Sequence, residues 1–144
     1  MIAGQLALFI AGLFAGAAIY ISLAEQPARL ALDDRALLLE WKGAYRRGFA
    51  MQAPLAFLGF VLGILAWFQT RNVSFLAGAL LMLANWPWTF LVVMRANKPL
   101  MATDPEQAGT SSRTLIVKWN AFHAVRSVLG CLAAAAFFYG LSGK

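Results

Sequence analysis

Apolar residues come in four long runs that are separated by shorter polar segments. The runs cover residues 2–24, 51–68, 73–94 and 119–141. Each is close to the ~20 residues that an α-helix needs to cross the ~30 Å hydrocarbon core of a bilayer. The pattern therefore predicts an all-α fold, a four-helix transmembrane bundle that the lipid bilayer surrounds. Because the runs take up most of the 144 residues, we expect a single transmembrane domain over residues 1–144.

Residues 34–48, just before the second run, show a different pattern. Apolar residues recur there at helical spacing, with charged residues between them. Asp33 or Asp34 is suited to cap such a helix. The pattern predicts a cytoplasmic amphipathic helix that leads into the second span, with Trp41 at the depth of the membrane interface. Its apolar face would consist of Leu37, Leu38, Trp41, Ala44 and Tyr45.

Composition agrees with a membrane protein, because 61% of the residues are hydrophobic and 12% are charged, against ~25% charged in soluble domains. The net charge of +6 has a simple cause in the placement of the basic residues. By the positive-inside rule, both long loops are cytoplasmic, both termini are outside, and the chain is integral to the plasma (inner) membrane. We therefore expect no nucleic-acid partner. The loops contain Arg29, Arg35, Lys42, Arg46, Arg47, Arg95, Lys98, Arg113 and Lys118, and the other side has only Arg71 and Lys144.

Loop length and small residues predict which helices touch. Only Gln69–Val73 connects the second and third runs, so these two helices should be antiparallel neighbours. Glycines four residues apart let backbones approach closely. Such pairs occur at Gly12 and Gly16 and at Gly59 and Gly63, and we expect both pairs at helix contacts. The sequence leaves open whether the chain forms a homo-oligomer.

A weak internal similarity relates the two halves of the chain. Ala24–Pro27 ends the first run as Ala96–Pro99 ends the third, and Trp41 precedes Tyr45 by four residues as Trp119 precedes His123. The match favours two parallel helix-hairpin repeats about an axis along the membrane normal. It would pair Glu25 with Asn97, and Tyr45 with His123. Chance similarity is the alternative.

A polar triplet interrupts the fourth run. Asn120, His123 and Arg126 fall on one face of about 100° of a helix. A charge at membrane depth costs at least ~2.5–3.5 kcal/mol on the insertion scale, so such a stripe faces other helices or a watery cavity. Polar residues at matching depths in the other helices predict a pocket toward the cytoplasmic side. These residues are Tyr20, Glu25, Gln52, Thr89 and Asn97.

Plainer readings of these residues remain open. Arg126 could pair with Glu25 and only pin two helices together, and His123 could be a hydrogen-bonded packing residue. The lone Cys131 excludes an internal disulfide and a multi-cysteine metal site. With one histidine, a single chain cannot build a bis-histidine haem site or a facial triad for iron. We therefore predict no metal and no cofactor, and leave haem or a lipid-derived ligand open.

The sequence resembles a known family, the anthrone oxygenase-like family of small four-helix membrane proteins. The similarity spans nearly the whole chain, and its most specific part is the segment from Trp119 to Arg126. The resemblance implies the four-helix fold. It also implies a reaction, because some fungal relatives oxidise anthrones to anthraquinones with molecular oxygen and without an evident cofactor. The motifs that carry it are Gly12–Gly16, Glu25–Arg29, Trp41 with Tyr45, Asn97–Leu100 and Trp119–Arg126.

The hypothesis that follows is a cofactor-independent oxygenase, or a related oxidoreductase, acting on a hydrophobic phenolic, anthrone-like small molecule. His123 would be the base, since its unperturbed pKa of ~6.5 suits proton removal near neutrality. Arg126 would stabilise an enolate oxygen, Asn120 and Asn97 would orient the substrate, and Glu25 would set the charge state of the pair. The alternative is a non-enzymatic small-molecule binding or transport module, or a membrane subunit of a larger assembly. The sequence does not decide whether the chain is an enzyme.

Overall fold

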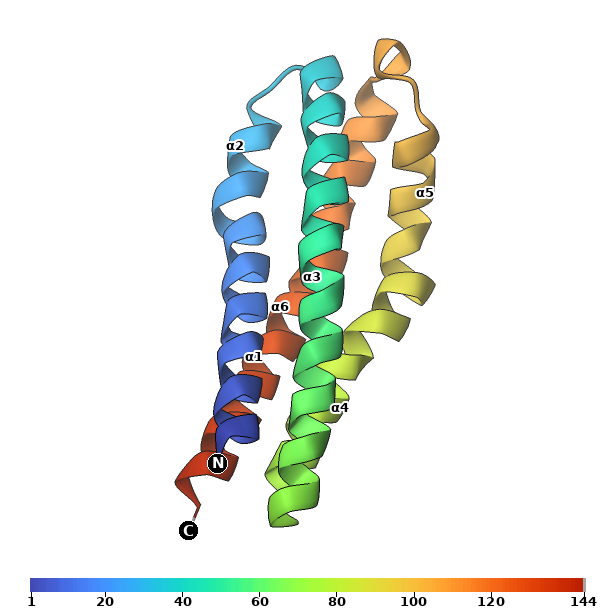
Figure 1. Cartoon of the computed structure of the whole chain (residues 1–144). Helices are drawn as coiled ribbons and strands as arrows, with labels where there is room; N and C mark the ends of the chain where they lie inside the picture. Colours follow the sequence, from blue (N-terminus) through green and yellow to red (C-terminus); the bar gives the residue numbers. More distant parts are fainter. Residues whose placement is uncertain (144) are drawn as a thin grey trace.

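The structure, a computed structural model, describes residues 1–143; Lys144, one of the two basic residues assigned to the outer side, lies outside them. Four long helical rods make up nearly all of this range (Figure 1). Each is long and apolar enough to cross a membrane, which confirms the predicted four-helix transmembrane bundle. The rods are α1 (Ile2–Tyr20) with η1 (Ile21–Glu25) and α2 (Gln26–Leu30); α3 (Asp34–Thr70); α4 (Val73–Trp88) with η2 (Thr89–Val93) and α5 (Met94–Ala102); and α6 (Thr110–Ser142), which follows the short turn η3 (Pro105–Gln107).

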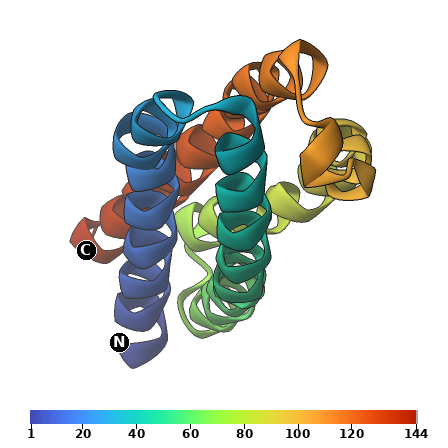
Figure 2. The ribbon, with the colours of Figure 1, turned by 90° about the horizontal axis from the view of Figure 1, so that it is seen from above.

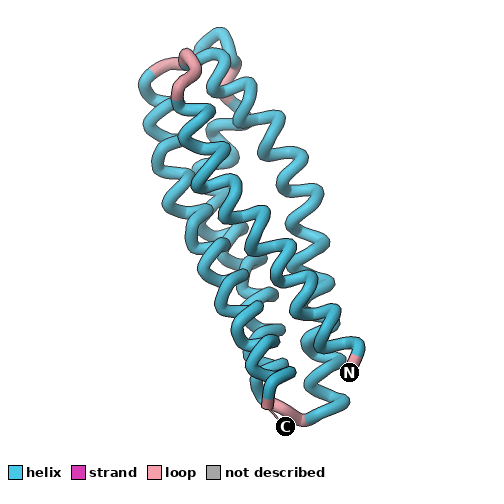
Figure 3. The backbone as a smooth tube through the Cα atoms, turned by 90° about the vertical axis from the view of Figure 1, so that its left-hand side faces the viewer, coloured by secondary structure: helices cyan, strands magenta, loops and turns pink. Residues whose placement is uncertain are grey.

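The rods form a closed ring of neighbours. Helix α1 packs against α3 and α6, and α4 packs against the same two helices from the other side (Figure 2). Both termini lie at one end of the bundle with the 71–72 turn, and the connections at 31–33 and 103–109 lie at the opposite end, called here the loop end (Figure 1). Figure 3 shows how little chain lies outside the helices. The predicted antiparallel pairing of the second and third spans is confirmed.

Local sequence explains where α3 and α4 begin and end. Asp33 caps α3 by accepting a hydrogen bond from the Ala36 N–H at 2.9 Å, as predicted. Arg71 then takes a left-handed conformation, with φ of 58°, and ends the helix. Asn72 caps α4 at once by accepting from the Ser74 N–H at 3.0 Å. These caps allow the two helices to reverse direction within two residues.

The segment 34–48 is helical and leads into the second span. It continues without a break into the second span as α3, which has 37 residues and so a length of ~55 Å. Leu37, Leu38 and Trp41 are buried within the bundle rather than at a lipid surface. Their amphipathic pattern arises because the rods also pack against one another beyond the apolar spans.

Two π-helical turns interrupt the first and third rods. In η1 the N–H of Gln26 bonds to the carbonyl of Ile21, five residues back. Pro27 follows, and its ring and missing N–H disturb the preceding turn. In η2 the N–H of Met94 bonds to Thr89 in the same way. The third rod bends here, so that α5 leans away from α3 (Figure 1); such turns are frequent at functional sites.

Small residues do mark the helix contacts, but not all of the predicted ones. Gly59 is buried, and a Cβ there would come within 2.7 Å of Met82 Cε. Gly12 and Gly16 are exposed with no neighbour within 4 Å of such a Cβ, so their expected helix contact is wrong for the single chain. Helices α1 and α6 lie close together instead at Gly130, where a Cβ would be 3.2 Å from the Ala15 backbone.

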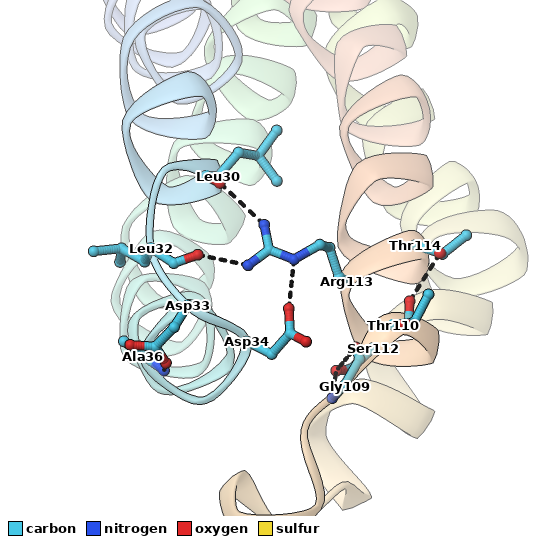
Figure 4. A network of polar contacts seen from close by, with 10 residues as sticks. All are labelled: Leu30, Leu32, Asp33, Asp34, Ala36, Gly109, Thr110, Ser112, Arg113 and Thr114. Atoms are coloured by element: carbon cyan, nitrogen blue, oxygen red, sulfur yellow. Dashed lines mark hydrogen bonds and ion pairs between the residues drawn. The ribbon is translucent and has the colours of Figure 1, made fainter.

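A hydrogen-bond network fastens the loop end. Arg113 of α6 donates to the carbonyls of Leu30 at 3.0 Å and Leu32 at 2.5 Å, and pairs with Asp34 (Figure 4). The two carbonyls lie where the first rod ends and lacks helical partners. One arginine therefore joins the first rod, α3 and α6 at the loop end.

Candidate functional site

A small cavity lies between all four rods in the half of the bundle nearer the loop end. We call it the histidine cavity. Its volume is about 20 Å³, enough for about one water molecule. The first rod contributes three residues, α3 five, the third rod two and α6 three. They are Ile21, Glu25 and Arg29; Ala44, Tyr45, Gly48, Phe49 and Gln52; Val93 and Asn97; and Trp119, His123 and Arg126.

His123 is held in a defined orientation. It is 1% exposed, and its ring stacks on Trp119 one turn earlier, with centroids 4.8 Å apart. Its Nδ1 lies 3.3 Å from the hydroxyl of Ser22 in η1. In the tautomer with the proton on Nδ1, this nitrogen donates a hydrogen bond to the Ser22 hydroxyl, and the free lone pair of the ring is on Nε2. Nε2 has no hydrogen-bond partner among residues 1–143, so this nitrogen is free to act on a ligand.

Arg126 is a buried cation that no carboxylate neutralises. The side chain is 8% exposed, and the four ion pairs within residues 1–143 do not include it. Its Nε is buried and without a hydrogen-bond partner. Its guanidinium carbon lies 5.4 Å from the centroid of the Phe14 ring, a cation–π contact. Such a cation in a membrane bundle normally has a counter-ion, so the group is suited to bind an anionic ligand.

Arg29 lines the same cavity, but its charge is balanced. It pairs with Glu25 on its own rod, and its Nε lies 2.8 Å from the Glu40 carboxylate on α3. Its guanidinium also lies over the Trp119 ring at 5.8 Å. A direct ion pair between Glu25 and Arg126, one of the readings left open above, is therefore absent from residues 1–143, although both residues line the same cavity as His123. Glu25 and Arg29 are four residues apart on one helix, a spacing that brings opposite charges together.

A second cavity adjoins the first on the side of α4. We call it the Asn85 cavity; its volume is about 10 Å³, and Arg126 and Phe49 line both cavities. Several polar atoms in the two linings are buried without a hydrogen-bond partner. Apart from Arg29 Nε, which lies within ion-pair distance of Glu40, three are donors and one is an acceptor, so the linings suit a ligand whose polar atoms are mainly acceptors. These atoms are Gln52 Nε2, Trp86 Nε1, Arg126 Nε and Asn85 Oδ1.

Most of the residues predicted for the site do lie around these cavities. Glu25, Gln52, Asn97, His123 and Arg126 line the histidine cavity, and Thr89 lines the Asn85 cavity. Two of these residues already use a polar side-chain atom in a hydrogen bond within the bundle. The Asn97 carbonyl oxygen accepts from the Trp119 indole at 2.9 Å, and the Thr89 hydroxyl donates to the Asn85 backbone at 2.7 Å.

Two predicted residues lie elsewhere. Tyr20 is 62% exposed and lines neither cavity, because it follows the buried Ala18 by two residues and so lies on nearly the opposite face of the helix. Asn120 is also absent from both linings, although its Oδ1 is buried without a partner. Helical periodicity places Asn120 and His123 on the same polar face of α6. Which part of that face meets the cavity depends on the neighbouring rods, so the sequence could not distinguish the two residues.

The sequence reasoning missed three residues, Ser22, Arg29 and Tyr45. The internal repeat indicated Tyr45, because it pairs that residue with His123. The contacts follow the same alignment: Tyr45 stacks on Trp41, as His123 does on Trp119. The Tyr45 hydroxyl lies 3.7 Å from Met94 Sδ, at the position that the repeat matches to Ser22. These contacts support the hypothesis of a duplicated hairpin, which stays a prediction.

Fold and site together define a class: a small four-helix membrane protein with a buried histidine and an unpaired arginine at a polar cavity between its helices. The family called anthrone oxygenase has a model that matches residues 41–136, more than half of the chain. The chain belongs to this family. The matched range includes Tyr45, Asn97, His123 and Arg126, but not Glu25 and Arg29 on the first rod. A search of curated proteins and a search of solved structures found no match.

Proposed function

We propose that the protein is a cofactor-independent oxygenase, which oxidises a hydrophobic phenolic compound of the anthrone type with molecular oxygen. The observation that carries the proposal is Arg126, a buried guanidinium without an anionic partner among the described residues, beside the chain's only histidine. An unpaired buried charge is costly. An anion formed on the substrate would offset that cost during the reaction, which is how an enzyme favours a transition state over a ground state.

The first step is proton transfer. An anthrone loses a proton from the carbon opposite its carbonyl, and the negative charge moves onto the carbonyl oxygen. His123 Nε2 takes the proton while Ser22 holds Nδ1. Arg126 donates to the enolate oxygen from a fixed position in a dry site; in other enzymes, removing one such donor costs about 10²–10³ in rate.

The second step consumes oxygen. The enolate gives one electron to O₂, and the two radicals combine into a peroxide on the carbon that lost the proton. The proton held by His123 returns to the peroxide, and loss of water leaves a carbonyl. One anthrone and one O₂ thus give one anthraquinone and one water, with O₂ as the only oxidant. No metal or organic cofactor takes part in this sequence.

The direct test is turnover in lipid nanodiscs with anthrone as substrate, followed by oxygen uptake and anthraquinone absorbance. Empty nanodiscs correct for spontaneous oxidation. His123→Ala should lose at least 100-fold in turnover while it still binds anthrone, because the base is gone and the arginine remains. Unchanged oxygen uptake in this variant would exclude His123 as the base. If the wild-type protein neither binds nor oxidises anthrone, the enzyme proposal is wrong and a binding or assembly role replaces it.

We also infer that the loop end of the bundle faces the cytoplasm, on the basis of the basic residues gathered in residues 29–47 and 95–118. Gln107→Cys in a Cys131→Ser background places a thiol at this end, and Gly143→Cys places one at the other. In intact cells an impermeant maleimide should label only the thiol at position 143. Labelling at 107 from outside would reverse the orientation.

A further inference from the structure

An apolar groove on the outer surface of the bundle runs along α3 and Trp86 of α4. We call it the lipid-facing groove. It has a volume of about 460 Å³ and almost no polar lining. That volume falls within the ~300–1,000 Å³ of small-molecule sites. The lining consists of Phe49, Ala50, Ala53, Pro54, Phe57 and Trp86.

The groove adjoins the site inside the bundle, separated from it by side chains that border both. Phe49, Ala53 and Trp86 also line the Asn85 cavity, and Phe49 lines the histidine cavity as well. Arg126 lines both inner cavities but not the groove. Three adjoining spaces therefore lie between the outer surface and His123, and Phe49 is the one side chain that borders all of them.

The volumes decide where the body of a substrate can lie. The two inner cavities, at about 20 and 10 Å³, have room for water-sized groups only. A three-ring aromatic molecule does not fit inside the closed bundle. The groove has the necessary space, and it lies beside the polar atoms that such a molecule needs.

The polar atoms at the inner end indicate what kind of molecule the groove receives. Asn85 Oδ1, Trp86 Nε1 and Arg126 Nε are buried without partners among residues 1–143, and all three residues line the Asn85 cavity, which shares Phe49, Ala53 and Trp86 with the groove. An acyl chain would leave all three unsatisfied, whereas a flat aromatic with oxygen atoms along one edge would satisfy them. The groove also begins two residues after the exposed Arg47, a residue type that marks the membrane interface, where aromatic rings with one polar end accumulate.

We propose, on the basis of the function proposed above, that the substrate comes from the bilayer sideways through this groove. Its rings pass along Phe49, Pro54 and Trp86 on the way in. Once Phe49 has moved aside, the middle ring lies with its carbonyl oxygen at Arg126 and the opposite carbon toward His123. The Phe49 side chain is the gate. It is 36% exposed and its ring centroid lies 6.2 Å from that of Tyr45, so a rotation of this side chain joins the three spaces without moving a helix.

The main test fills the groove and measures anthrone binding separately from turnover. Ala53→Trp places an indole in the groove, and Ala135→Trp, at an exposed position of α6, is the matched control. Binding of radiolabelled anthrone is measured in nanodiscs, in the wild-type and His123→Ala backgrounds. We expect Ala53→Trp to weaken binding at least tenfold in both backgrounds, and Ala135→Trp to change it less than twofold.

Two further measurements do not depend on how Ala53→Trp folds. Phe49→Ala removes the gate and should raise the association rate of anthrone severalfold. Ala53→Cys in a Cys131→Ser background can be labelled with N-phenylmaleimide after the protein has folded, and saturating anthrone should slow that labelling at least fivefold.

The outcomes separate this inference from the proposed chemistry. If the wild-type protein oxidises anthrone and Ala53→Trp binds and oxidises it equally well, the groove route is wrong and the oxygenase stands. If the wild-type protein binds anthrone without oxidising it, and Ala53→Trp loses the binding, the groove stands and the oxygenase falls. If no variant binds anthrone, both are wrong.

Discussion

Two buried arginines line the same cavity, and their surroundings are opposite. Arg29 is 3% exposed and has two carboxylates, Glu25 and Glu40, within ion-pair distance. Arg126 is 8% exposed and belongs to none of the ion pairs of residues 1–143. The first arginine is part of the structure that holds three rods together at the loop end. The second has no ion-pair partner among residues 1–143, so its charge is available to a ligand.

Position along the rods explains the difference. Arg29 lies in the last turn of α2, close to the polar ends of the rods, where a carboxylate on α3 is in reach. Arg126 lies deeper on α6, among apolar side chains such as Phe14, and the 15 residues after it have no charge. Burial alone therefore does not mark a functional residue. Burial without neutralisation is the stronger reason to propose a function, because an unpaired buried charge is costly for the fold.

The largest expected effect is the loss of activity when Arg126 loses its charge. Arg126→Met keeps much of the side-chain volume and removes the cation, so turnover should fall at least ~100-fold. Its unfolding temperature should stay equal to the wild-type value or rise, because an unpaired buried charge has been removed. Arg47→Met, at an exposed position of α3, is the control and should change neither quantity. A large loss of stability in Arg126→Met would show that Arg126 has a structural partner.

The opposite result, a loss of stability with little loss of turnover, is expected when Arg29 loses its carboxylate partners. Glu25→Gln combined with Glu40→Gln leaves that guanidinium unpaired and should destabilise the protein by about 1–3 kcal/mol, less than for a fully buried pair because the carboxylates are partly exposed. The measurement is reversible unfolding in mixed detergent micelles. Turnover per folded molecule should fall less than tenfold. A double variant as stable as the wild type would remove the contrast between the two arginines.

Arg126→Lys tests whether charge alone is enough. Lysine keeps the cation but loses the planar fork of the guanidinium, which can donate two parallel hydrogen bonds to one oxyanion. We expect a loss of about tenfold in kcat/KM for anthrone, between the wild type and Arg126→Met. Steady-state oxygen uptake measures it. Activity equal to that of Arg126→Met would mean that geometry, rather than charge, is what the site needs.

The smallest effect is expected at the residue that links the two regions. Trp119 lies beneath Arg29, stacks on His123 and donates to Asn97. Trp119→Phe keeps a ring for the stacking but loses the hydrogen bond, so stability should fall by about 0.5–1.5 kcal/mol. The loss should be similar with and without anthrone, as measured by thermal unfolding. A loss of turnover above tenfold would place Trp119 in the catalytic site itself.

Much of this molecule can be read from residue order. Four apolar runs determined four spanning helices, since no other arrangement hides that much backbone from lipid. Asp33 and Asn72 determined where α3 and α4 begin, because a cap acts within one turn. The polar stripe of α6 named His123 and Arg126 correctly as buried residues, because a membrane helix turns such residues away from lipid.

Other features depend on how the rods pack, and no single-helix pattern contains them. The sequence places two arginines, Arg29 and Arg126, where either could pair with Glu25. Only the packed bundle shows that Arg29 forms the ion pair and that Arg126 has no carboxylate partner among residues 1–143. The glycine pair at 12 and 16 looks like the pair at 59 and 63, yet only the second meets a neighbouring helix. Tyr20 and Ser22 are two residues apart, and only the tertiary structure places Ser22 against His123 and Tyr20 outside. The physical reason is that periodicity fixes which residues share a face, whereas the neighbouring helices decide what that face meets.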